Sequence, residues 1–245
     1  MTGMGAVFRR EFRSYFAAPI ALVYIVVFLA ASGIFTFSLG GFFERGQADL
    51  ETFFFYHPWL YLFLVPSIAM RLWAEDRRQG TFELVLTLPV SAGAVVGGKF
   101  LAAWAFTTFA LSLTFPLWIT VNWLGQPDNG VIAAGYAGSL LMAGAYLAIG
   151  AAISAMTRNQ VAAFAATVLA CFLFLMSGLP FVTEFVLGLA GAEAARLVAS
   201  FSFLTQFSSL LTGVLEARAV LFFASLIAFW LFVNLIAVER AREKG

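Results

Sequence analysis

The residues best suited to bind another molecule lie between Met70 and Ala103. This stretch holds seven charged side chains of a chain that has 14 basic and 13 acidic residues, and an uncharged segment of membrane length lies on each side of it. Two of them, Arg71 and Glu75, are four residues apart and can form an ion pair on one face of a helix. The stretch is either a charged docking hairpin or a solvated loop, and the residue pattern leaves both interpretations open.

The order of residues after the first charges predicts a short helix in this hairpin. Gly80 permits the backbone to turn, and the pattern over 81–88 is that of an amphipathic helix. Pro89 prevents the helix from continuing, and Ser91 is the expected N-cap of the next helix. One side of the short helix carries Phe82, Val85 and Leu86, and another side carries Glu83 and Thr87.

The chain lacks the residue patterns that most catalytic and cofactor-binding sites require. The chain contains no G-x-x-x-x-G-K-[ST] loop, so we do not expect it to hydrolyse ATP. Its one histidine, His57, cannot supply a histidine pair for zinc or haem, and Cys171 lies in an apolar run. No ionisable residue lies near the centre of an apolar segment, which argues against a secondary transporter. An intramembrane enzyme would lack a catalytic pair. We therefore predict no catalytic, cofactor-binding or metal-binding residue.

The composition favours a membrane protein. Hydrophobic residues make up 62% of the chain and charged residues 11%, against roughly 25% charged residues in soluble domains. The net charge of +1 gives no reason to expect nucleic acid as a partner. A helix of about 20 residues crosses the hydrocarbon core. The uncharged segments of about this length are 14–43, 52–70, 100–127, 129–157, 159–183, 197–215 and 219–238.

Basic residues determine the number and orientation of the spans. With six spans, one side holds Arg9, Arg10, Arg13, Arg71, Arg77, Arg78, Lys99, Arg158, Arg240, Arg242 and Lys244, and the other holds Arg45, Arg196 and Arg218. This bias places both termini in the cytoplasm, and a seventh span would destroy it. The segment 184–218 then becomes an external, partly re-entrant piece. We predict spans at about 19–42, 53–73, 100–124, 131–156, 160–182 and 219–238.

Residues 1–18 differ from the spans because they combine aromatic and basic residues. Four aromatic residues recur at helical spacing, and the arginines lie largely off their face; the set is Phe8, Arg9, Arg10, Phe12, Arg13, Tyr15 and Phe16. The pattern indicates an amphipathic helix in the plane of the inner membrane interface. The alternative is a basic flank that only sets the topology. Pro19 is expected to open the first span, where its missing N–H costs little.

The charged hairpin also carries a likeness to a known family. The run E-D-R-R-Q-G-T-F-E-L-V-L-T-L-P-V-S, followed by G-K-F-L-A, resembles the pattern of permease subunits of ABC-2 type transporters. Further matches are R-E-F-R-S-Y-F-A-A-P-I at 10–20 and P-W-L-Y-L-F-L-V-P-S-I-A-M-R at 58–71. The chain is most similar to the small permeases of the gliding-motility and nitrous-oxide-reductase-maturation systems. The matching residues of the hairpin are Glu75, Gly80, Thr81, Glu83, Leu84, Leu86, Thr87, Pro89, Gly98 and Lys99.

This resemblance implies a fold and a function. It implies one all-α membrane domain over 1–245, with a coupling hairpin at 75–98 between spans two and three. Its segment 75–90 would be a coupling helix that sits in a cleft of a separate ATPase subunit, which binds ATP and Mg. The implied coupling residues are Glu75, Gly80, Thr81, Phe82, Glu83, Leu84, Leu86 and Pro89.

The implied assembly is a permease homodimer with two ATPase copies in the lipid bilayer of the bacterial inner membrane. It would couple ATP hydrolysis to export or to conformational work. The alternative is force transmission to an external auxiliary protein without transport of a substrate.

Overall fold

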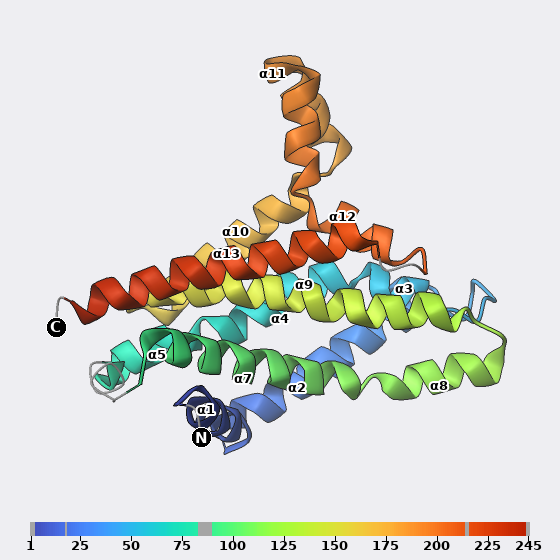
Figure 1. The fold of residues 1–245 in the computed structure, drawn as a ribbon. Helices are drawn as coiled ribbons and strands as arrows, with labels where there is room; N and C mark the ends of the chain where they lie inside the picture. Colours follow the sequence, from blue (N-terminus) through green and yellow to red (C-terminus); the bar gives the residue numbers. More distant parts are fainter. Residues whose placement is uncertain (1–2, 18, 83–89, 214–215, 244–245) are drawn as a thin grey trace.

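The computed structural model describes residues 3–17, 19–82, 90–213 and 216–243, and every regular element within these ranges is helical. The prediction of an all-α protein is therefore confirmed for this part of the chain. Long helices run side by side in one bundle, and α11 projects from its side (Figure 1). The elements are α1 (Gly3–Ala17), α2 (Pro19–Ile34), the π-helix η1 (Phe35–Leu39), α3 (Glu51–Phe55), α4 (His57–Ala69), α5 (Arg71–Gln79), α7 (Ala92–Ser112), α8 (Phe115–Leu124), α9 (Asn129–Met156), α10 (Gln160–Met176), α11 (Pro180–Ser200), α12 (Phe203–Leu210) and α13 (Ala217–Arg242).

Helix α9 lies at the centre of the bundle, where α4, α7, α10, α12 and α13 pack against it. In its most apolar window, 78% of the residues are buried inside the chain, against 22% for α13. The small residues of α9 explain the close packing. A Cβ atom on Gly150 would lie 2.4 Å from the Cβ atom of Ala69, so α4 can approach only a glycine at this position. Glycine and alanine on α9 thus permit close contacts between helices.

Four helical segments in the described ranges are long and apolar enough to cross a membrane, namely Ala21–Leu39, Ala92–Leu124, Asn129–Met156 and Ala217–Arg242. They correspond to the first, third, fourth and sixth predicted spans. Helices α10 and α11 form a pair bent by 78°, which gives up to five spans. The second predicted span is divided into α3, α4 and α5, with breaks at Tyr56 and Met70. The count of six spans remains a prediction.

Three local features predicted from the sequence agree with the structure. Helix α2 begins at Pro19, and α5 is capped by Gly80 with φ of +69°. The Ser91 hydroxyl accepts a hydrogen bond from the Ala94 N–H at 3.3 Å, as expected of an N-cap. The predicted short helix over 81–88 falls mostly on 83–89, which lie outside the described residues.

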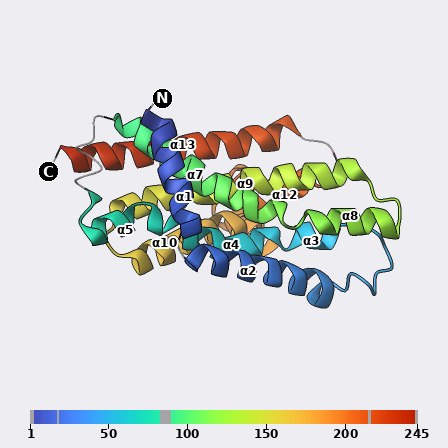
Figure 2. The same ribbon diagram turned by 90° about the horizontal axis from the view of Figure 1, so that it is seen from below.

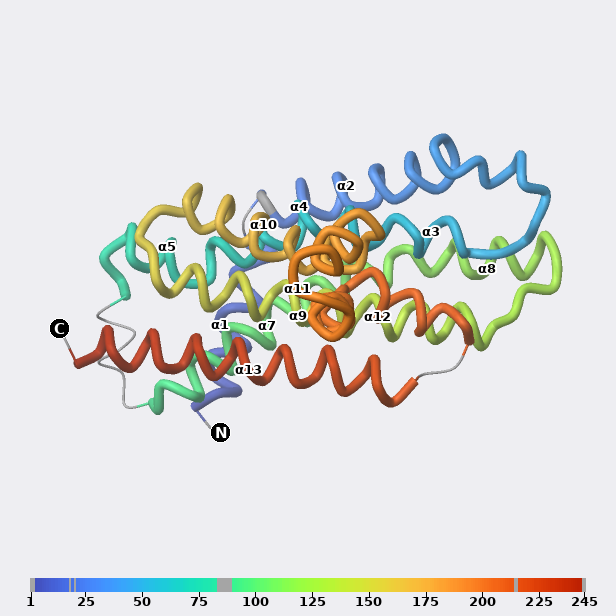
Figure 3. The backbone as a smooth tube through the Cα atoms, turned by 90° about the horizontal axis from the view of Figure 1, so that it is seen from above, coloured from blue at the N-terminus to red at the C-terminus, as the bar shows by residue number. Residues whose placement is uncertain are grey.

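The bundle has two distinct ends. Helix α1, helix α5 and the last turns of α13 lie at one, which we call the hairpin end. Helices α3 and α8 lie toward the other, the far end (Figures 1 and 3). Seen from below, α1 crosses the long helices rather than running along them (Figure 2). Helix α1 therefore does not run parallel to the long helices, and its placement in the plane of the membrane interface stays a prediction.

The two ends should face opposite sides of the membrane. The 28 residues of α9 extend for about 42 Å, enough to cross the hydrocarbon core. Single cysteines that replace Arg78 and Arg242 should react with an impermeant maleimide from one side, and Gln126→Cys from the other. The native Cys171 is buried and should stay silent. Labelling of all three positions from one side would contradict this arrangement.

Candidate functional site

A buried lysine connects three helices at the hairpin end. Lys99 lies in the second turn of α7, and its side chain is only 3% exposed. Its Nζ atom lies 2.8 Å from Asp76 Oδ2 on α5 and 3.3 Å from Glu11 Oε1 on α1. The same atom lies 5.3 Å from the centre of the Trp73 ring, within range of a cation–π interaction. We call Lys99, Glu11, Asp76 and Trp73 the Lys99 cluster.

Two glycines let α1 come close enough to reach Lys99. A Cβ atom on Gly98 would lie 2.8 Å from the Cβ atom of Val7 and 3.0 Å from the carbonyl oxygen of Met4. A Cβ atom on Gly97 would lie 3.0 Å from the Met4 sulfur. Larger residues at 97 and 98 would therefore push α1 away from α7 and separate Glu11 from the lysine.

The predicted interfacial residues lie on two sides of α1. Phe8 and Phe12 are half-buried, whereas Arg9, Arg10 and Arg13 are exposed. The aromatic side continues toward α7, where Tyr15 stacks on Phe106 with ring centres 4.9 Å apart. Helix α1 is thus braced against the bundle by its aromatic side and presents its arginines outward.

Electrostatics keep Glu11 ionised within the cluster. Burial raises the pKa of its carboxyl group, but Lys99 and Arg10 together more than offset this, and the pKa lies below its ordinary value. Arg10 Nη2 contacts Glu11 Oε1 at 2.6 Å. The carboxylate therefore joins an exposed arginine to a buried lysine. Charges in such positions are tolerated only when they are paired.

The start of α5 is held by a side chain from the central helix. The break at Met70 leaves the first N–H groups of α5 without partners inside the helix. The hydroxyl of Ser154 on α9 accepts hydrogen bonds from the N–H groups of Trp73 and Ala74 at 3.2 and 3.0 Å. It donates to the carbonyl oxygen of Met70 at 2.9 Å. One hydroxyl thus ties the break between α4 and α5 to the most buried helix.

Local interactions stiffen the rest of α5. The predicted ion pair is confirmed, with Arg71 Nε 2.5 Å from Glu75 Oε2, and the hydrogen bond from Arg71 lowers the pKa of the Glu75 carboxyl. The Thr81 N–H donates to the Asp76 carbonyl at 2.9 Å, and the Gly80 N–H donates to the Arg77 carbonyl at 3.4 Å. These two bonds form the capping motif that ends many helices on a left-handed glycine.

Phe82 lies inside the chain rather than on its surface. It is 7% exposed, and its ring packs edge-on against Trp73 with centres 5.9 Å apart. The Arg77 guanidinium lies 4.1 Å from the centre of the same ring. Of the predicted coupling residues, the structure therefore brings Glu75, Gly80, Thr81 and Phe82 together around Trp73 and Asp76. The other four, Glu83, Leu84, Leu86 and Pro89, lie outside the described residues.

Sequence reasoning missed several members of this site. It gave Lys99 a place in the family pattern and Asp76 a place in the charged run, but no contact to either. It gave no role to Glu11, Trp73 or Ser154. One signal was available, because Lys99 is a lone cation immediately before the uncharged segment 100–127. Such a residue needs a partner, but the sequence does not indicate which acidic residue supplies it.

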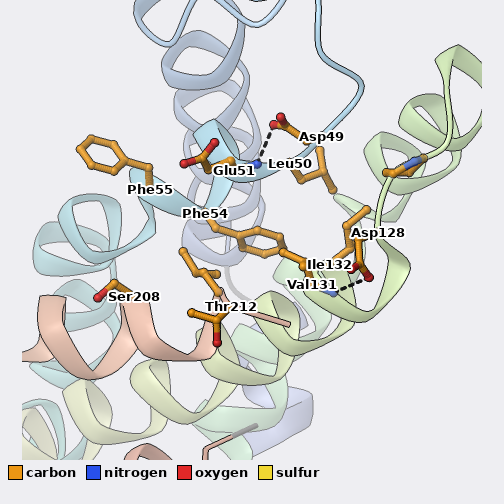
Figure 4. Close-up of a pocket in the computed structure, with 12 residues that line it drawn as sticks. Asp49, Leu50, Glu51, Phe54, Phe55, Asp128, Val131, Ile132, Ser208 and Thr212 are labelled. Atoms are coloured by element: carbon orange, nitrogen blue, oxygen red, sulfur yellow. Dashed lines mark hydrogen bonds between the residues drawn. The ribbon is translucent and has the colours of Figure 1, made fainter. Parts of the chain in front are cut away.

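A second candidate is a pocket of about 430 Å³ toward the far end, between α3, the start of α9 and α12 (Figure 4). Its carboxylates are already engaged. Asp49 accepts a hydrogen bond from the Glu51 N–H, and Asp128 accepts one from the Gly130 N–H. Arg45 pairs with Glu51 at 2.6 Å. Among the residues that the structure describes, no group of three His, Cys, Asp or Glu side chains could hold a metal ion.

Removal of the buried ammonium should destabilise the protein. Lys99→Met leaves Asp76 without its cation and Glu11 with Arg10 alone, and loss of one partner of a buried pair costs about 3–5 kcal/mol. We expect a clearly lower melting temperature in detergent, measured by tryptophan fluorescence. The exposed Arg13→Met on α1 is the matched control and should be neutral. A variant with Lys99→Met, Glu11→Gln and Asp76→Asn together should recover part of the loss. An unchanged melting temperature for Lys99→Met would contradict the role of this cluster.

The lowered pKa values of Glu11 and Glu75 predict a dependence of stability on pH. A carboxyl group whose pKa is lower in the folded state stabilises the fold at pH values above its unfolded pKa of about 4.3. This contribution is lost as the pH falls through the folded pKa. The melting temperature should therefore drop below about pH 4, and it should drop less in Glu11→Gln, which starts lower at neutral pH. Parallel curves for the two proteins would refute the prediction.

Comparison with known families adds an independent finding to this geometry. The model of a family described as "ABC-2 family transporter protein" matches residues 6–238. The matched region contains the Lys99 cluster, the hairpin and nearly all of α13. A search of curated proteins finds no significant match. Since the family match covers almost the whole chain, this protein belongs to the ABC-2 transporter family.

Proposed function

We propose that the chain is the membrane-spanning permease subunit of an ATP-driven transporter, and that a separate ATPase subunit docks on the hairpin over 75–98. Membership of the ABC-2 family supports the permease assignment. The observation that supports docking at the hairpin is its attachment to the bundle through the Lys99 cluster. A loop that is only solvated has no need of such an attachment.

The contacts of the hairpin suit the transmission of a displacement. The Arg71–Glu75 pair and the cap at Gly80 make α5 a stiff unit. Ser154 ties its start to the central helix α9, and Lys99 ties its middle to α1 and α7. A push on the segment after Gly80 would therefore reach three helices of the bundle. The arrangement would convert closure of the ATPase subunits into movement of the permease.

The described residues divide into those that position the hairpin and those that are free to touch a partner. Glu75 and Phe82 are engaged inside the chain, so we assign both to positioning. Arg78 and Gln79 are exposed at the end of α5 and are available to the ATPase. We propose that Glu83, Leu84, Leu86 and Pro89 supply the remaining contacts, as the family resemblance implies.

The rest of the proposed assembly follows from the same function. Two copies of the chain would form a homodimer and bind two ATPase subunits, which carry ATP and Mg. Both termini would face the cytoplasm from a bacterial inner membrane. The exposed arginines of α1 support this orientation, because the cytoplasmic leaflet is negatively charged.

The decisive experiment measures ATP turnover and co-purification of the ATPase subunit. The isolated chain should not hydrolyse ATP, and turnover should appear only with the ATPase subunit present. Gly80→Val should weaken the complex, because a branched residue at φ of +69° costs about 1–2 kcal/mol, or roughly five- to thirtyfold in an equilibrium constant. Gly33→Val is the matched control, since no neighbouring atom lies within 4 Å of a Cβ atom there.

Two outcomes would overturn the proposal. One is robust hydrolysis of ATP by the isolated chain. The other is association and turnover at the wild-type level in Gly80→Val and Glu83→Ala, which would return the hairpin to a solvated loop.

A further inference from the structure

Helix α11 projects from the bundle and has almost no contact with the rest of its own chain. We call residues 180–200 the arm. It rises from the side formed by α10, α12 and α13 (Figure 1), and Figure 3 shows it end-on above them. All residues of the arm are described, and Ala195 alone among them is buried. The large apolar side chains exposed on it are Phe181, Phe185, Leu187, Leu189 and Leu197.

The arm leaves the bundle within the depth of the membrane. Helix α10 has 17 residues and extends for about 26 Å, less than the roughly 30 Å of the hydrocarbon core. The chain then bends by 78° into α11. The arm therefore leaves the bundle sideways at the depth of the hydrocarbon core, where lipid or protein must cover it. It does not extend into the water beyond the far end.

Lipid is a poor cover for three features of the arm. Glu193 and Arg196 form an ion pair at 3.0 Å, and their side chains are 89% and 77% exposed. Glu184 is also exposed, and ionisable groups at membrane depth are found facing protein or water. The backbone at Gly191 is not helical, with φ of 83° and ψ of 177°, and no neighbouring atom lies within 4 Å of a Cβ atom there. Irregular backbone at this depth is tolerated only where protein or a water-filled cavity covers it.

Water is an equally poor cover, because the same arm exposes two phenylalanines and three leucines. Several large apolar side chains exposed on one projecting segment indicate a site of contact with protein or membrane. A protein surface at membrane depth meets both demands, since it can bury the apolar side chains and satisfy the ionisable groups and the open backbone.

We propose that the arm packs on a second copy of this chain, with each arm lying across the side of the other bundle. The inference rests on the proposed function, in which two permease copies work together. A second copy lies at the same depth in the membrane, whereas an external protein would have to reach below the membrane surface. The size also fits, because the arm supplies 21 residues and a standard interface uses roughly 20–30 residues a side.

Site-specific photo-crosslinking tests the proposal directly. A benzoylphenylalanine replaces Phe185, which is 67% exposed on the arm, or Phe115, which is 50% exposed on α8. Helix α8 lies on the side of the bundle opposite to the arm (Figure 1) and serves as the matched control. Two differently tagged copies are expressed together with the ATPase subunit and irradiated in native membranes. The expected product joins the two tags several-fold more efficiently from position 185 than from position 115.

Other outcomes of this experiment overturn the proposal. Equal yields from both positions would mean that the copies meet by chance or through another surface. A product with lipid alone would mean that the bilayer covers the arm, and a product with a different protein alone would mean that a heterologous partner covers it. Each result leaves co-purification of the ATPase subunit unaffected, so failure of this inference is distinguishable from failure of the proposed function.

A second variant tests the energetic contribution of the arm. Phe181→Ser with Phe185→Ser changes exposed residues only, so the single copy should still fold and bind the ATPase subunit. The fraction of dimer in detergent should fall several-fold relative to the wild type and to Phe115→Ser. An unchanged dimer fraction would also overturn the proposal.

Discussion

The hairpin end of this protein depends on one buried ammonium group. Lys99 is enclosed by three helices, and a charge in that position must be neutralised by acidic groups close to it. Two carboxylates do so, and they come from α1 and α5 rather than from α7 itself. The three helices must therefore keep their relative positions, since separation of α1 or α5 from α7 would remove one of the two carboxylates that neutralise the ammonium. The glycines beside the lysine permit the close approach that this pairing requires.

A different kind of interaction, a set of neutral hydrogen bonds, connects the hairpin to the long helices of the bundle. Ser154 replaces the hydrogen bonds that the helix break at Met70 removes from the backbone. Because this hydroxyl belongs to the central helix, α5 cannot tilt without straining bonds inside the bundle. Ion pairs at the hairpin end and neutral hydrogen bonds deeper in the bundle thus form one continuous path. Under the proposed function, such a path would carry a displacement of the hairpin into the bundle, which a flexible loop would not do.

The arm differs from the hairpin end because the rest of the chain does not cover its charged groups. At the hairpin end each charge of the Lys99 cluster has partners within the chain, whereas the arm carries ionisable groups and an open backbone at Gly191 without cover from the chain itself. The enclosed charges of the hairpin end and the uncovered charges of the arm occur in the same membrane protein. The contrast indicates that a single copy is complete at the end where it would meet the ATPase subunit, and incomplete along the side from which the arm projects.

The sequence alone determined the features that arise within a few residues of one another. The all-helical class, the start of α2 at Pro19, the cap at Ser91, the turn at Gly80 and the Arg71–Glu75 pair follow from local geometry, and the hairpin motif was sufficient to indicate the family. The tertiary structure decided the partners of Lys99, the burial of Phe82, the division of the second predicted span and the direction of the arm. These depend on how distant helices dock. Periodicity shows which residues share a helix face, but only packing selects which acidic residue among 13 meets a buried lysine.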